Sequence, residues 1–410
     1  MDRVLDAAAE LFWKNGYAAT TTREIAAALD IQQASLYHHI SSKQGLLYEL
    51  CVSSMRQILV AIPAKLDGIA CPLERILVFA RAHLKGLLGH QKRNAVMLTE
   101  FAGLPPRHRA EAVELRQQYA DLMRSAVEQA QREGAIRTDI SSTLLTLTLL
   151  NTLNWTAVWF REDRDLPAEQ LADVFVKIYL HGAASADAPR LRAAAETGAV
   201  NPNRAAKAVR IANRPGSSGE TAMTRRLLRA AVALFSRKGY VSTSTREVAA
   251  LLGLQKASLY YHVPSKEELL YLICKSLLER IRQDVKTAIE AVEHPGERLR
   301  TLICAHTESM LRDQAGHAVT FGEMRHLSRE RLTQVLSLRD SYEELVRRAL
   351  EEGQRAGAVR RDIYSKYLCL GLLGMLNRVP VWYRKRGPLS PGQLGRLLAA
   401  IYMDGVAARK

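Results

Sequence analysis

Two stretches of the chain carry hydroxyl, carboxamide, imidazole and ammonium groups in the same order. The first reads GYAATTTREIAAALDIQQASLYHHISSKQGLL from Gly16, and the second reads GYVSTSTREVAALLGLQKASLYYHVPSKEELL from Gly239. Such groups donate hydrogen bonds to phosphate oxygens, and glutamine and lysine also pair with the edges of adenine and guanine. The residue types therefore point to contacts with a nucleic acid.

The candidates for phosphate contact share a polar tip at the predicted surface of these stretches. They are Thr20, Thr22, Tyr37, His39 and Lys43 in the first stretch, and Thr243, Thr245, Tyr260, His262 and Lys266 in the second. The threonines are expected to be exposed and to donate to phosphate. Each lysine is expected in the first turn of a long helix, where free amide groups and the helix dipole favour a phosphate.

Base reading is assigned to the variable positions of the short helix before that lysine. The candidates are Gln32, Gln33, Ser35 and His38 in the first stretch, and Gln255, Lys256, Ser258 and Tyr261 in the second. Taken alone, each of these residues is more often a solvated surface group, but the whole set occurs twice. Because Gln33 is replaced by Lys256, the two stretches are expected to read different bases.

Both stretches belong to an internal repeat with an offset of 223 residues. Between residues 12–47 and 235–270, 20 of 36 positions are identical, and the same offset pairs Trp159 with Trp382. A whole unit has therefore been duplicated. The expected domains are DNA-contacting domains at 1–48 and 224–271, helical domains at 49–183 and 272–410, and a linker at 184–223. The linker is rich in Ala, Pro, Gly, Ser and Arg, and a flexible chain of its length has a root-mean-square span of about 35 Å.

Each repeat is predicted to contain nine helices and no strand. The first helix is expected to end at Gly16, and a capping box of Thr21 and Glu24 is expected to open the second. Asp30 replaces the glycine found at the same turn in the second repeat, Gly253, and aspartate tolerates the left-handed region better than most residues. A short third helix and a long fourth helix follow.

The pattern G-Y-x-x-T-[ST]-x-R-E-[IV]-A, followed by S-L-Y-x-H-[IV]-x-S-K-x-x-L-L, closely resembles the N-terminal DNA-binding domain of TetR-family regulators. The resemblance implies a helix-turn-helix whose third helix enters the major groove of double-stranded DNA. Ala34 and Ala257 depart from the family, in which many members have glycine. The implied fold class is all-α, with two tandem units that each carry a DNA-binding domain and a helical effector and dimerisation domain.

The remainder of each repeat is similar to the effector domains of TetR regulators of lipid and aromatic-acid catabolism. The segments LPPRHRAEAVELRQQYADLMRSAVEQAQREGAIRTDI and LLNTLNWTAVWF carry this resemblance. It implies a small-molecule effector, with acyl-CoA thioesters as candidates, and dimerisation through the last two helices of each unit. In a fused chain the two halves can supply both sides, as an intrachain pseudo-dimer, and a homodimer of chains is the competing arrangement.

The candidates for effector contact are two histidines and a set of aromatic or cationic side chains at helical spacing. They are His83, Trp155 and Trp159 in the first repeat, and His306, Arg378 and Trp382 in the second. Arg378 suits an anionic ligand group, whereas a packing role is the simpler alternative for each tryptophan and histidine. Pro380 is expected to interrupt its helix, so the two pockets are not expected to be equivalent.

Composition limits the remaining function classes. The 410 residues carry a formal net charge of +16, which favours a polyanionic partner, either a nucleic acid or an acidic membrane surface. Five scattered cysteines form no CxxC pair, which argues against a disulfide framework or a zinc site and favours a reducing cytoplasm. No signal peptide is predicted, because the start MDRVLDAAAELF is amphipathic and has no long apolar core. No membrane anchor is predicted, because the apolar stretch at 143–160 contains asparagines and threonines.

No Gly-rich phosphate loop, nucleophile elbow or metal-spaced cluster is found, so neither enzymatic activity nor a cofactor is predicted. The expected function is a ligand-responsive repressor that binds an imperfect palindrome and is released by its effector. A DNA-bound architectural or scaffold protein without a ligand response is the alternative, and a filled effector core would favour it. A helical enzyme would require converging titratable groups that the sequence does not supply.

Overall fold

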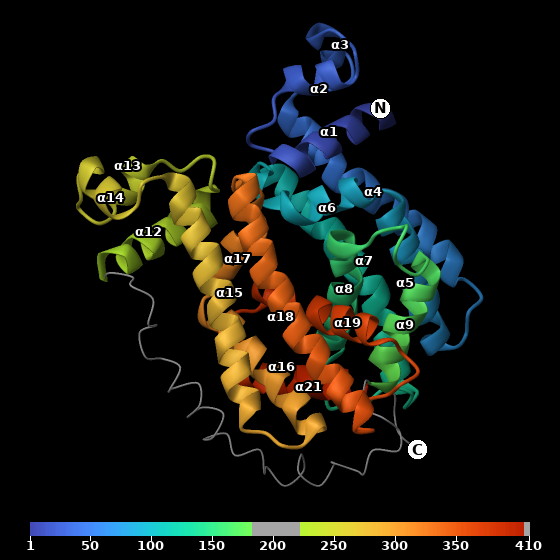
Figure 1. The fold of residues 1–410 in the computed structure, drawn as a ribbon. Coiled ribbons are helices and arrows are strands. Elements are labelled where there is room, and N and C mark those ends of the chain that lie inside the picture. Colours follow the sequence, from blue (N-terminus) through green and yellow to red (C-terminus); the bar gives the residue numbers. More distant parts are fainter. Residues whose placement is uncertain (183–221, 406–410) are drawn as a thin grey trace. The chain divides into compact units, whose positions relative to one another are not determined.

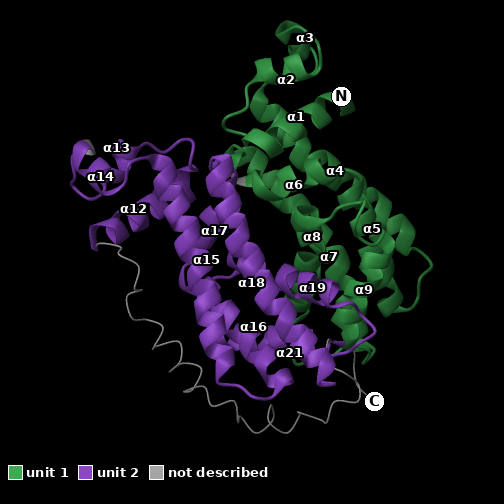
Figure 2. Cartoon of the chain, viewed as in Figure 1, with its two compact units in different colours: residues 1–181, 406–410 green, residues 182–405 purple. Residues whose placement is uncertain are grey.

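The computed structural model describes residues 1–182 and 222–405 of the chain (Figure 1). Contacts among them divide the protein into two compact units, Met1–His181 and the described part of Gly182–Gly405 (Figure 2). Both units are helical, and no strand occurs in the described ranges. Of the expected linker, residues 184–221 lie outside the described residues, and the last two already belong to a helix.

Unit 1 contains the nine α-helices that the sequence predicts, with one short 3₁₀ helix between the sixth and the seventh. They are α1 (Asp2–Asn15), α2 (Thr22–Ala28), α3 (Gln33–Tyr37), α4 (Lys43–Leu66), α5 (Pro72–Gly89), α6 (Gln91–Thr99), η1 (Phe101–Gly103), α7 (Pro106–Arg132), α8 (Ser142–Trp159) and α9 (Ala168–His181).

Unit 2 follows the same order with one additional break. Its elements are α12 (Ala222–Lys238), α13 (Thr245–Ala250), α14 (Lys256–His262), α15 (Lys266–Glu290), α16 (Pro295–Arg312), α17 (Gln314–Glu323), η2 (Met324–His326), α18 (Arg329–Arg355), α19 (Ser365–Asn377), α20 (Val379–Trp382) and α21 (Pro391–Asp404).

The break in unit 2 confirms the effect expected of Pro380. Where unit 1 has the continuous helix α8, unit 2 has α19 and α20, and Arg378 caps both of them. Proline has no amide hydrogen and its ring clashes with the preceding turn, so it is tolerated only in the first turn of a helix. Pro380 lies in the first turn of α20.

The first three helices of each unit form a small head, and the caps predicted from the sequence are present in it. Thr21 and Glu24 form a capping box at α2, as Ser244 and Glu247 do at α13. Gly16 ends α1 with a φ of 82°, and Asp30 adopts a φ of 55° in the turn between α2 and α3. Local sequence therefore determines where the short helices begin and end.

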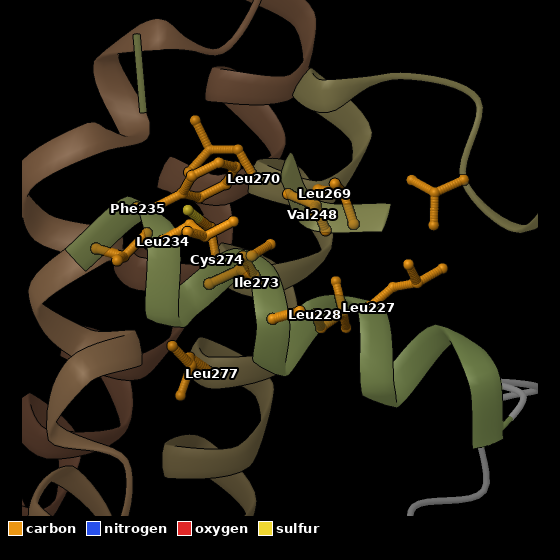
Figure 3. Packing of buried hydrophobic residues seen from close by; sticks show 14 of the residues in the cluster. Leu227, Leu228, Leu234, Phe235, Val248, Leu269, Leu270, Ile273, Cys274 and Leu277 are labelled. Atoms are coloured by element: carbon orange, nitrogen blue, oxygen red, sulfur yellow. The ribbon is translucent and has the colours of Figure 1, made fainter. Parts of the chain in front are cut away.

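A single hydrophobic cluster joins the head of unit 2 to the helices behind it. Leu227, Phe235 and Val248 from α12 and α13 lie in one cluster with Leu270 and Ile273 of α15 (Figure 3). The same cluster includes residues of α17 and α18. The head is thus attached through its own core, and α15 belongs to both parts of the unit.

Behind each head, the fifth and last helices make the most extensive contact of the unit, α5 with α9 and α16 with α21. Helix α4 also packs on α5, α6 and α7. Among the described helices, α4 alone is long and apolar enough to cross a membrane, and the core helix of a soluble protein meets the same criterion. The packing of α4 assigns it to the core of unit 1.

Replacement of Asp30 tests the left-handed turn. Asp30→Val should lower the melting temperature by roughly 2–6 °C, because a β-branched residue at positive φ costs about 1–2 kcal/mol. Asp30→Gly should melt at or above the wild-type temperature. Thermal denaturation followed by circular dichroism checks both variants, and a wild-type melting curve for Asp30→Val would contradict the assignment.

Candidate DNA-binding and effector sites

The second and third helices of the head are linked by side-chain hydrogen bonds. The Gln33 side-chain amide donates to the Thr22 hydroxyl at 2.9 Å, and that hydroxyl lies 3.3 Å from the Tyr37 hydroxyl. In unit 2 the hydroxyls of Thr245 and Tyr260 are 3.1 Å apart. These contacts fix the angle between the two helices, which decides how the third helix can be presented to DNA.

Most of the base-reading candidates are exposed on the third helix. Gln32, Ser35 and His38 are exposed in unit 1, and so are Gln255, Ser258 and Tyr261 in unit 2, whereas Gln33 is partly buried. The Lys256 side chain lies outside the described part of the chain. Tyr261 is 88% exposed, which leaves its ring available to a partner.

The tyrosine and histidine candidates for phosphate contact are accessible to different degrees. Tyr37, His39 and Tyr260 are exposed, and His262 is partly buried against the edge of the Tyr261 ring. In unit 2 an open depression lies between the second and third helices and the start of α15. It is lined by Val241, Ser242, Thr243, Ser244, Thr245, Tyr260, Pro264, Ser265 and Lys266.

The expected exposure of the threonines is wrong for three of the four. Thr20 and Thr243 are 0% and 2% exposed, and each donates its hydroxyl hydrogen to a glycine carbonyl four residues earlier, at 2.9 Å. Thr245 is also buried, and Thr22 is partly buried. The threonines at 20 and 243 therefore close the turn after the first helix, because a buried hydroxyl requires a hydrogen-bond partner.

The lysine that opens the fourth helix is held by the protein itself. The Lys43 ammonium group donates to the carbonyls of Tyr17, Ala18 and Thr20 at 2.9, 3.3 and 2.8 Å, and lies 4.5 Å from the centre of the Tyr17 ring. An ammonium group has three hydrogens, so its donors are fully used. Lys43 therefore has a structural role in the protein without DNA, and its contact with a phosphate stays a prediction.

Lys266 repeats this arrangement in unit 2. It donates to the carbonyls of Tyr240, Val241 and Thr243 at 3.0, 3.4 and 3.0 Å and lies 4.3 Å from the centre of the Tyr240 ring. Partial burial lowers the pKa of both ammonium groups. Each lysine thus clamps the loop between the first two helices onto the start of the fourth.

The two effector-domain histidines are buried and paired with tyrosines that sequence reasoning did not select. His83 Nδ1 bonds to the Tyr119 hydroxyl, and His306 Nδ1 lies 2.6 Å from the Tyr342 hydroxyl. Burial lowers the pKa of His83 to about 4 and that of His306 to about 3. Both histidines are therefore neutral near pH 7. The signal available in the sequence was the survival of both pairs at the repeat offset.

The structure does not place Arg378 and Trp382 on one continuous helix. Arg378 lies at the junction of α19 and α20, whereas Trp155 and Trp159 share α8. The Trp159 ring meets the Phe175 ring edge-on at 6.4 Å. Within the described chain, the indole nitrogens of Trp159 and Trp382 and Nε2 of both effector histidines are buried without a hydrogen-bond partner. Polar atoms left open at equivalent positions of two units indicate a place for a ligand or water.

In the described part of the chain, no group of three or more His, Cys, Asp or Glu residues is placed to hold a metal ion. The heads present polar side chains to an extended partner, and the helices behind them contain buried groups with unused hydrogen-bonding capacity.

Family models match the chain twice. The model described as "Bacterial regulatory proteins, tetR family" matches residues 4–50 and 227–271. The model described as "Tetracyclin repressor-like, C-terminal domain" matches residues 70–183 and 292–406. Each unit is thus matched in both of its parts.

The similar proteins each match less than half of this chain but nearly all of their own length. The HTH-type transcriptional repressor KstR2 of Rhodococcus jostii is 27% identical over 194 residues, 47% of this chain and 95% of that protein. KstR2 of Mycobacterium tuberculosis is 29% identical over 185 residues, 44% of this chain and 90% of that protein. Among solved structures, PfmR from Thermus thermophilus is 30% identical with a TM-score of 0.41, covering 43% of this chain and 96% of its own. AibR, solved with isovaleryl coenzyme A and operator DNA, is 32% identical with a TM-score of 0.40, covering 43% of this chain and 95% of its own.

The lysine clamp can be separated from a phosphate contact by salt dependence. Lys43→Met or Lys266→Met should weaken binding to specific and non-specific duplexes alike, because the loop loses its attachment. The slope of log K against log salt concentration should stay nearly constant, whereas loss of a phosphate contact would reduce it by about 0.9. Fluorescence anisotropy at several salt concentrations measures the slope, and a reduction close to one unit would restore the phosphate role.

Burial of neutral histidines predicts a loss of stability in mild acid. The folded-state pKa values lie below about 6.5, the value in an unfolded chain, so the unfolded state binds more protons as the pH falls. The free energy of unfolding should be highest above pH 6.5, where the histidines are neutral in both states. Between pH 6.5 and pH 5.5 it should decrease by roughly 1 kcal/mol for each histidine. Melting temperatures of wild type and His83→Leu/His306→Leu at both pH values test this, and an equal decrease in both proteins would contradict it.

Proposed function

The chain belongs to the TetR family of bacterial regulatory proteins in both of its units, and from this membership we propose a repressor that binds an imperfect palindrome and responds to an anionic, lipophilic effector. It is a transcriptional regulator that carries two helix-turn-helix heads. The names of the similar KstR2 repressors support repression as the mode of control. We propose the cytoplasm as its location.

The proposal of an imperfect palindrome rests on a difference between the two heads. They share one framework but differ in the residues proposed to read bases. The capping box and the lysine clamp are the same in both heads. At the exposed position 38, however, His38 is replaced by Tyr261, and in the sequence the partly buried Gln33 is replaced by Lys256. Because base recognition depends on the side chains that reach the groove, each head should prefer its own half-site. A regulator with two identical heads would favour a symmetric operator.

One polypeptide can supply both heads to a single operator. Two recognition helices must lie about 34 Å apart to meet successive turns of the major groove, which is within the reach expected of the linker. We therefore propose an intrachain pseudo-dimer on double-stranded DNA, with pairing through α8 and α9 of unit 1 and α19 to α21 of unit 2. An assembly of two chains with four heads is the competing arrangement.

For the effector, we propose an amphiphilic anion such as an acyl-CoA. The open polar atoms of the buried histidines and tryptophans support a site in the helices behind each head. Arg378, next to the helix break of unit 2, adds a cationic group near Trp382. Binding there would favour a state in which the heads no longer match the operator, which is how a ligand with unequal affinity for two states changes DNA binding.

Light scattering of the free protein and of its operator complex tests the arrangement. One chain of 45.7 kDa on a compact operator with two unequal half-sites is the expected result. Exchange of Gln33 and His38 for the residues of unit 2 should move the preference toward a symmetric operator. Obligate pairing of chains, with protection of a longer DNA segment, would contradict the pseudo-dimer.

A further inference from the structure

A partly buried, charged side chain in unit 1 has no acidic partner among the described residues. Arg116 of α7 makes no hydrogen bond or ion pair with any described residue, and its guanidinium lies 4.9 Å from the centre of the Phe101 ring. Burial lowers its pKa, and the Cys51 side chain of α4 is close enough to interact with its charge. The side chain nevertheless keeps some accessible surface.

The equivalent arginine of unit 2 is neutralised by its own helix. Arg339 donates to Asp340 at 3.1 Å, and the two side chains are 37% and 64% exposed. Burial raises the pKa of the nearby Glu343 carboxyl, and the charge of Arg339 acts in the opposite direction. Unit 1 has Gln117 and Ala120 at the two acidic positions, so Arg116 has lost both neutralising groups while remaining charged.

Arg116 also lies one turn from the open polar pair of unit 1. Tyr119 is three residues further on α7, on the same face of the helix, and it bonds to His83 of α5. A neutral histidine and a tyrosine hold two polar hydrogens, and their mutual hydrogen bond uses one of them. Whichever tautomer is present, one hydrogen remains beside the ring of Phe79, and the Asn154 side chain lies close enough to His83 to interact with it.

We propose that unit 1 contains an anion-binding site in which Arg116 holds the charged head of an amphiphile, while its apolar body lies toward Phe101 and the His83–Tyr119 pair. Unit 2 lacks this arginine site because Arg339 is already paired, so the two effector sites proposed above are unequal and each chain binds one such anion tightly, in unit 1. The inference rests on the proposed effector response and assigns it to one unit. Its ligand is an anionic group joined to an apolar chain, and the charge can come from the carboxylate of a free acid or from the phosphates of its CoA conjugate.

The energetics favour a ligand role over a structural one. A partly buried guanidinium without an ion-pair partner adds little stability, and replacing a poorly compensated buried charge by an apolar group of similar size is often neutral or stabilising. A residue that costs stability in the free protein is typical of a binding site. Arg116→Met should therefore melt at or above the wild-type temperature in the absence of ligand.

Calorimetry with octanoate, octanoyl-CoA and octanol tests the site on the full chain. Octanoate or octanoyl-CoA should bind with a stoichiometry of one per chain, and octanol at least about tenfold more weakly, because it cannot form a charge-assisted hydrogen bond. Arg116→Met should weaken binding of the anion by about tenfold or more, and Arg116→Lys by less. Arg339→Met is the matched control and should bind like the wild type.

The outcomes separate this site from the proposed function. Binding of octanoyl-CoA alone, with loss in Arg116→Met, supports the site and identifies the conjugate as its source. Equal binding of octanol and octanoate, or a lower melting temperature with unchanged affinity in Arg116→Met, would overturn it. If none of the probes binds while operator affinity is intact, both the site and the effector response are wrong, and the DNA-binding function remains.

Discussion

The short helices of each head depend on the long fourth helix for their stability. Helices of five to seven residues, such as α2, α3 and α13, are marginal in water on their own. They persist because α4 and α15 offer an apolar face, and in unit 2 one cluster unites this face with α17 and α18. Any displacement of the fourth helix therefore moves the surface that meets DNA. The lysine at its first residue extends the same constraint to the loop after the first helix.

Local sequence predicted the parts of the fold that local chemistry decides. The capping boxes, the glycine at the end of α1, the left-handed Asp30 and the break at Pro380 each follow from the residue itself and its immediate neighbours. The tandem repeat similarly predicted the domain composition that the family models show. These features require no knowledge of which segments meet in space.

The candidate sites were harder to predict because tertiary contacts decide them. Thr20 and Lys43 have the composition of phosphate ligands, but backbone carbonyls brought close by the turn use their hydrogens. Tyr119 forms a hydrogen bond with His83, which is 36 residues away in the sequence, and no local sequence pattern predicts that contact. The isolation of Arg116 could have been noticed, since no acidic residue stands three or four positions from it on the helix.

The two units keep one framework but differ in how charge is distributed within it. In unit 1 Arg93 of α6, with its side chain 8% exposed, donates to Asp6 at 2.6 Å and to Asp2 at 3.0 Å, which ties α6 to α1. Unit 2 has Gly316 at that position, where a Cβ would lie 2.8 Å from Leu277. In a homodimer every substitution occurs in both subunits, so an unpaired charge that lowers the folding stability lowers it twice. In a fused pair it occurs once. Unit 1 can therefore retain the unpaired Arg116 and the ion pairs of Arg93 with α1. Unit 2 has a close apolar contact at Gly316 instead, and its stability is not reduced by the charges of unit 1.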